Sequence, residues 1–216
     1  DDNDGNPQED SELIFTGSTF AINASDAFYA ARVKFNNGGT TSVTGTVFAD
    51  VEVSDGTEVD LQDAFTINGL LTVNSSDVID LTTGTLTLND DANILGTVKP
   101  NQGGITFNSG GAQTIDGASG QTLTLGNATV SNAAGNTVVT IAATSAPVVT
   151  NDLTLQHGTE LNLGRRLEIN GNFTNTGGLF SFTNDATEET IAMTGGGTQQ
   201  IAASSDITLS NVEIAN

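Results

Sequence analysis

The chain has 216 residues, of which 26 are acidic and five are basic, and its formal net charge is −21. We expect neither nucleic acid nor an anionic membrane surface as a partner, because both are bound through clusters of lysine and arginine. The sequence has no cysteine, which excludes disulfides, and no apolar run reaches the roughly 18 residues of a membrane-spanning helix. The composition favours a secreted or cell-surface protein whose own charge keeps it dispersed.

Residues 1–12 are predicted to be an acidic, flexible tether, because they contain too few apolar side chains to offset the entropy lost on ordering. Asp2 and Asp4 flank an asparagine and precede Gly5, in the manner of a calcium-binding loop. The match is incomplete, since the first ligand would precede the chain and the twelfth position is serine. We expect no cofactor, with calcium at Asp2 and Asp4 as the alternative.

Beyond the tether, short β-favouring runs alternate with corners rich in glycine, asparagine and aspartate. Residues 26–35 contain the alanines of a short helix, but residues 32–36 alternate with period two, so a strand is predicted there. The predicted strands are 13–15, 19–22, 26–35, 46–48, 51–53, 65–67, 70–73, 78–81, 85–88, 94–98, 105–107, 122–125, 128–130, 153–155, 167–169, 172–174, 179–182, 190–193 and 211–216.

A long imperfect repeat covers the last two-thirds of the chain. The sequence GAQTI at 111–115 returns as GTQQI at 197–201, and NATVSN at 127–132 returns as NVEIAN at 211–216. Further matches extend the repeat back to residue 71, and the shift between copies is roughly 81–86 positions. A repeat built from short strands indicates a stacked architecture.

Two all-β architectures are compatible with these strands. Asx-Gly pairs at 55–56, 68–69 and 170–171 would suit the hairpins of antiparallel β-sandwich repeats. Small or β-branched apolar residues, few aromatics and polar corners instead favour coils of about 20 residues whose strands stack in parallel. We therefore predict that residues 13–216 form one right-handed parallel β-helix, or β-solenoid, of about ten coils. The expected inward side chains are Leu71, Val73, Leu81, Leu86, Leu88, Leu123, Leu125, Leu153, Leu155, Leu161, Leu163, Leu167 and Ile169.

A solenoid leaves unpaired strand edges at its two ends. The sequence offers no amphipathic helix to cover either end, and its last residues, 211–216, still have a strand pattern. We therefore expect the chain to be a section of a longer protein, or to dock end to end with copies of itself.

The corner G-x-Q-x-I, followed by a strand of the form L-x-N-x-x-[VI]-x-N, resembles repeats of large secreted surface proteins of the Bacteroidetes group. The resemblance covers residues 65–216, and residues 13–64 more loosely. It implies a β-solenoid adhesin or filamentous protein and assigns no catalytic residue. The matching segments are GGAQTIDG at 110–117, GNFTNTGG at 171–178, GGTQQI at 196–201 and LSNVEIAN at 209–216.

One set of residues hints at catalysis. Asp90, His157 and Arg165-Arg166 have the order of the carboxylates, histidine and basic clamp of β-helix enzymes that cleave acidic polysaccharides. Asp90 and His157 are three coils or so apart, however, which is roughly 14 Å along a stack. Both residue types are also common in turns. The prediction is therefore a non-enzymatic structural or adhesive protein, with polysaccharide binding or cleavage as an alternative.

Ice binding is the remaining alternative. Residues 85–87 and 122–124 read Thr-Leu-Thr, and flat threonine arrays bind ice on some solenoids. The tripeptides do not recur once per coil at one register, so threonine is interpreted as a strand former. A glycan-binding adhesin would instead need exposed aromatic side chains, for which Tyr29 and Phe28 are the candidates.

Overall fold

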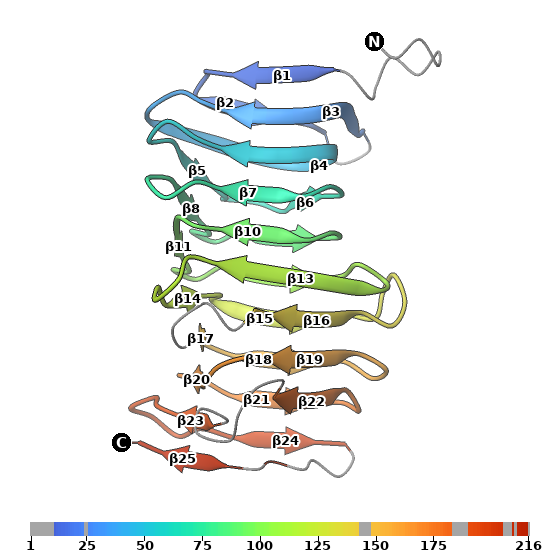
Figure 1. Cartoon of the computed structure of the whole chain (residues 1–216), viewed down its shortest axis with the longest axis vertical. Helices are drawn as coiled ribbons and strands as arrows, with labels where there is room; N and C mark the ends of the chain where they lie inside the picture. Colours follow the sequence, from blue (N-terminus) through green and yellow to red (C-terminus); the bar gives the residue numbers. More distant parts are fainter. Residues whose placement is uncertain are drawn as a thin grey trace.

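The computed structural model describes residues 11–23, 26–142, 148–182, 190–204, 209 and 211–215. The described residues contain β-strands and no helix, and every strand pairing among them is parallel. The chain is a β-solenoid of about nine turns (Figure 1). The predicted parallel stack is thus confirmed, and the alternative of antiparallel sandwich repeats is wrong. In the described part of the chain, no helix has the length and apolar character needed to cross a membrane.

Each turn contributes a strand to three columns that run the length of the stack. The first column contains β1 (Glu12–Phe15), β3 (Phe28–Phe35), the end of β4 (Thr40–Val53), β7 (Leu71–Val73), β10 (Ala92–Ile94), β13 (Ala112–Gly117), β16 (Val138–Ile141), β19 (Glu160–Leu163) and β22 (Leu179–Phe182). The second contains β2 (Thr19–Ala21), the start of β4, β5 (Glu58–Asp60), β8 (Val78–Asp80), β11 (Thr97–Lys99), β14 (Leu123–Thr124), β17 (Val148–Thr150), β20 (Leu167–Ile169), β23 (Ile191–Met193) and β25 (Val212–Ile214). The third contains the start of β3, the middle of β4, β6 (Phe65–Ile67), β9 (Thr85–Leu88), β12 (Gly104–Phe107), β15 (Asn127–Val130), β18 (Leu153–Leu155), β21 (Phe173–Asn175) and β24 (Ile201–Ala203).

The strand boundaries differ from prediction where the chain turns a corner. The runs predicted at 46–48 and 51–53 belong to β4, a single 14-residue strand that takes part in all three columns. The run predicted at 94–98 is divided between β10 and β11 at Gly96. A side chain at Gly96 would collide with the carbonyl oxygens of Asn74 and Asp77 in the turn before, so the corner requires glycine there. Residues 28–35 form a strand, as the alternation within this segment predicts.

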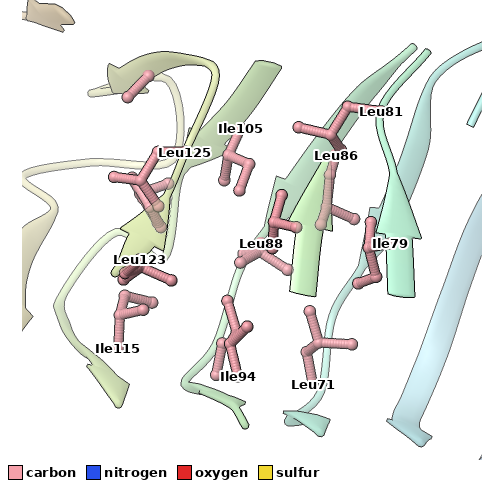
Figure 2. Close-up of a cluster of buried hydrophobic side chains, with 14 of the residues drawn as sticks. Leu71, Ile79, Leu81, Leu86, Leu88, Ile94, Ile105, Ile115, Leu123 and Leu125 are labelled. Carbon is pink, nitrogen blue, oxygen red and sulfur yellow. The ribbon is translucent and has the colours of Figure 1, made fainter. Parts of the chain in front are cut away.

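The core is one continuous column of aliphatic and phenylalanine side chains. Figure 2 shows side chains from successive turns, such as Leu71, Ile94 and Ile115 of the first column, gathered between the strands. All thirteen side chains predicted to point inward are buried. The alternation of a strand puts every second residue into this column, and the register of the parallel pairs keeps inward residues stacked on inward residues.

The two matched copies of the G-x-Q-x-I corner share a structural role. Gln113 is buried, and its side-chain amide donates to the carbonyl oxygens of Leu88 at 3.2 Å and Asp90 at 2.5 Å, in the turn before. Gln199 donates in the same way to the carbonyl oxygens of Ile169 at 2.8 Å and Gly171 at 2.9 Å. Each glutamine thus ties its own turn to the preceding corner through two backbone oxygens, which gives a physical reason for the recurrence of the motif.

The matched copies do not lie on the same side of the solenoid. Residues 71–73 form β7 in the first column, and their counterparts 153–155 form β18 in the third. Residues 86–88 lie in β9 of the third column, and their counterparts 167–169 form β20 of the second. Each pair is eleven strands apart, which is three and two-thirds turns, so the second copy is rotated by one column.

Polar ladders connect the corners of successive turns. Between the third and first columns, the Asn89 amide donates to Asn68 Oδ1 at 2.7 Å, and the Asn108 amide donates to Asn89 Oδ1 at 3.3 Å. Asn68 in turn donates to the Val47 carbonyl oxygen at 3.0 Å. The stacked polar side chains predicted at the corners are therefore present.

The two ends of the stack differ. At the N-terminal end, Phe20 packs edge-to-face against Phe15, Phe28 and Phe35, with ring centroids 5.3 to 5.8 Å apart, and this cluster closes the core. At the C-terminal end, Ile201, Val212 and Ile214 pair with the inward residues of the preceding turn. They are nonetheless 45%, 45% and 73% exposed, so the apolar column continues to the surface.

Leu88→Ala tests the inward column. Leu88 is fully buried, so the truncation is expected to lower the free energy of unfolding by about 2–5 kcal/mol. The matched control is Thr87→Ala, which removes an outward side chain from the same strand and is expected to change stability by no more than about 0.5 kcal/mol. Urea unfolding followed by circular dichroism measures both, and equal effects would contradict the assigned register.

Candidate functional site

The outward side of the third column carries a threonine at the same register in seven consecutive turns. Consecutive members are direct partners in the parallel pairing of β4, β6, β9, β12, β15, β18 and β21. All are partly exposed. The residues of this threonine ladder are Thr46, Thr66, Thr87, Thr106, Thr129, Thr154 and Thr174.

The Thr-x-Thr tripeptides do not recur once per coil, as expected, since Thr85 pairs with Gly104 in the next turn. A single threonine nevertheless recurs at one register in each of these turns. Members of the ladder are unevenly spaced along the chain, because the corners between strands vary in length. The step from Thr129 to Thr154, for example, is longer than the step from Thr87 to Thr106. No fixed period in the sequence can reveal such a ladder. The signal that could have found it is a threonine between two inward residues, as in residues 65–67 and 153–155.

Two aromatic side chains stand at the N-terminal end of this face. Tyr29 in β3 and Phe48 in β4 are direct pairing partners, and their rings stack with centroids 4.7 Å apart and planes 11° apart. Tyr29 is 53% exposed and Phe48 is 42% exposed. We call these two residues the aromatic pair. The candidate Phe28 is wrong, because its side chain is only partly exposed and packs edge-to-face on Phe20.

A β-bulge in β3 positions the pair. The pairing of β3 with β4 shifts between Tyr29 and Arg32, where β3 has one residue more than its partner. The backbone N–H groups of Ala31 and Arg32 both donate to the Ser11 carbonyl oxygen, at 2.9 and 3.1 Å. The extra residue lets Tyr29 point outward opposite Phe48 while Val33 still points into the core. No local sequence pattern marks this bulge, which is why Phe28 was predicted to face outward. Phe48 could have been found from the alternation of β4, since it lies between buried Val47 and Ala49.

A shallow depression of about 420 Å³ adjoins the aromatic pair at the corner between the second and third columns. Gly45 makes this corner with a φ of 106°, and a side chain at Gly45 would collide with Ile22. Thr46 connects the depression to Phe48, two residues further along β4 on the same side. The other residues that line the depression are Ile22, Thr44, Asp63, Ala64 and Thr66.

The basic side chains close to the aromatic pair form ion pairs with a carboxylate of the chain. Lys34 Nζ lies 3.0 Å from Glu52, and an Arg32 guanidinium nitrogen lies 3.6 Å from the same carboxylate. Partial burial acts to raise the pKa of Glu52, but the hydrogen bond and charge of Lys34, with help from Asn74 and Arg32, hold it below the usual value. Arg32 and Lys34 are therefore engaged by Glu52.

The residues that hinted at catalysis are not brought together. Asp90 and His157 occupy the same kind of corner, after β9 and β18, but three turns separate them, which is roughly 14 Å. Arg166 forms ion pairs with Glu168 at 3.1 Å and with Glu213 at 2.6 Å.

The calcium candidates Asp2 and Asp4 lie outside the described residues, as does most of the predicted tether 1–12. Within the part of the chain that the structure describes, no group of three or more His, Cys, Asp or Glu side chains is arranged to hold a metal ion. The outward side of the third column, with its aromatic pair, depression and threonine ladder, is therefore the best candidate site. It offers stacking surfaces and hydroxyl groups.

The ion pairs around Glu52 predict a pH-dependent contribution to stability. Because the pKa of Glu52 is lowered in the folded state, its pairing with Lys34 stabilises the fold above the ordinary glutamate pKa and is lost as the pH falls through the lowered value. Lys34→Gln should therefore lower the free energy of unfolding at pH 7, and this loss should shrink as the pH falls below the ordinary glutamate pKa and through the lowered value. Lys34→Arg is the control that keeps the charge. A Lys34→Gln effect that does not change with pH would contradict this assignment.

A comparison with protein families, curated proteins and solved structures finds no match to this chain. The parallel solenoid therefore rests on the structure itself. The Bacteroidetes-type adhesin or filament identity remains a prediction from motifs such as those at 110–117 and 171–178.

Proposed function

We propose that this chain is a non-enzymatic stalk or adhesive segment, secreted or displayed on the surface of a bacterial cell. The observation that carries the proposal is the parallel stack of about nine turns around one apolar column. Backbone pairing joins each turn only to its neighbours, so length is added without a change of architecture. The excess of acidic over basic side chains supports the proposal, because like-charged rods resist side-by-side association.

Copies of the chain, or neighbouring segments of a longer protein, are the partners that we propose for the two ends. The uncovered Ile201, Val212 and Ile214 already have the inward register of a further turn. All strands run parallel, so the N-terminal edge of a second solenoid meets this C-terminal edge in the same direction as a turn of the same chain does. Such a contact joins the C-terminal edge of one chain to the N-terminal edge of the next, and repetition of it leads to open fibres.

Electron microscopy of the purified chain tests the end-to-end contact. We expect rods that join into filaments as the concentration rises. Ile214→Asp should reduce filament formation, because it places a charge in the uncovered apolar column. The matched control is Leu179→Asp, since Leu179 is 66% exposed on the outward side of β22. Rods that stay single at every concentration would refute the fibre, and equal loss in both variants would refute the proposed contact.

Ice binding is a second candidate function, and the threonine ladder is the observation that favours it. Seven threonines present a methyl and a hydroxyl group at each turn, repeated about every 4.8 Å along a parallel sheet. A regular array of this kind is suited to an ordered layer of water.

Inhibition of ice recrystallisation tests this second candidate. Thr106 lies in the middle of the ladder, so Thr106→Lys should abolish the inhibition by placing a long charged side chain on the face. Thr140→Lys makes the same change on the outward side of the first column and should have no effect. Absence of inhibition by the unmodified chain would exclude this function, whichever variant is used.

A further inference from the structure

We propose that the aromatic pair and the adjoining depression form a binding site for a neutral glycan. This inference does not depend on the stalk proposed above, since it concerns one patch near the N-terminal end of the third column. The components are the stacked rings of Tyr29 and Phe48, the hydroxyl groups of Thr44, Thr46 and Thr66, and the carboxylate of Asp63.

The aromatic pair is the first reason. Phe35, Phe65, Phe107 and Phe173 are among the largest fully buried side chains, whereas both members of the pair face the solvent. Large exposed aromatic rings are uncommon where nothing binds, because they leave apolar surface in water. The bulge in β3 is a backbone irregularity that keeps Tyr29 on the outside, and bulges often re-aim side chains next to functional sites.

The depression supplies the second, independent reason. Thr46 lines it, and Phe48 is about 7 Å further along the same side of β4, so a ligand longer than one sugar unit can reach both. Its lining combines hydroxyl groups and one carboxylate with the apolar side chains of Ile22 and Ala64. A concave surface of mixed polarity beside an aromatic platform is the usual composition of a small-ligand site.

A sugar ring has the matching chemistry. Its C–H faces are apolar and stack on aromatic rings, whereas its hydroxyl groups around the edge exchange hydrogen bonds with hydroxyl and carboxylate oxygens. A short oligosaccharide can place one ring on the aromatic pair and direct the next toward Thr46 and Asp63. The two parts of the site thus recognise the two kinds of surface that every sugar unit carries.

The surrounding charge specifies a neutral ligand. The chain has a net charge of −21, and Asp63 is exposed at the edge of the depression. Arg32 and Lys34 lie close to the aromatic pair in the sequence, but both are engaged by Glu52. An anionic glycan would therefore meet repulsion, and these two cations are already paired with a carboxylate of the chain itself.

Tyrosine fluorescence gives a direct measurement. Tyr29 is the only tyrosine and the chain has no tryptophan, so its emission reports on this site alone. Titration with cello-, chito-, malto- and xylo-oligosaccharides should give a saturable change in emission with at least one series. Sedimentation with insoluble cellulose, chitin, starch and xylan gives a second measurement that does not depend on the fluorophore.

The variants separate the two parts of the site. Phe48→Ala and Tyr29→Ala should each weaken binding by about tenfold or more, whereas Tyr29→Phe should retain most of it. Ala64→Arg should also weaken binding, because it fills the depression without touching the rings. Leu179→Ala is the control, since it removes an exposed apolar side chain at the far end of the chain. Circular dichroism confirms that each variant is folded.

Three results would overturn the proposal. One is the absence of binding to every neutral glycan tested, and another is preferential binding of acidic glycans such as polygalacturonate. The third is binding that survives in both Phe48→Ala and Ala64→Arg. Filament formation should be unchanged in Tyr29→Ala, so failure of the glycan site and failure of the stalk are distinguishable.

Discussion

Parallel pairing between consecutive turns is the interaction on which the rest of this structure depends. Strands inside the stack pair with the turn before and the turn after, except that β11 and β14 of the second column are not paired with each other. The pairing fixes which side chains stack on which. The same register that places Leu71 next to Val51 in the core places Thr87 next to Thr66 on the surface. The hydrophobic column and the threonine ladder are therefore two consequences of one backbone arrangement.

Side chains enforce this register where the backbone leaves its strands. Buried Gln113 donates to two carbonyl oxygens at the corner of the turn before it, and Gln199 does the same three and two-thirds turns later. The asparagine ladder through Asn68, Asn89 and Asn108 connects another set of corners. A buried corner carbonyl without a partner is costly, so these amides allow the corners to vary in length while the strands stay aligned.

The interior of this protein can be predicted from the sequence far better than its surface. Alternation alone identifies inward residues such as Leu88 and Leu163, because a strand has a fixed period of two. The threonine ladder escapes prediction because its spacing along the chain changes with the length of each corner. The prediction that Phe28 faces outward fails because a single extra residue in β3 determines which of Phe28 and Tyr29 is exposed. Such bulges depend on contacts between turns and have no local sequence pattern.

The eleven-strand separation of the matched copies has a geometric consequence. Eleven is not a multiple of three, so the second copy carries each matched motif to the next side of the rod. An array of such units would display each motif along a spiral, and only the fourth copy would face the same way as the first. The threonine ladder is the exception, because Thr129 of the first copy pairs with Thr154 of the second in the same column.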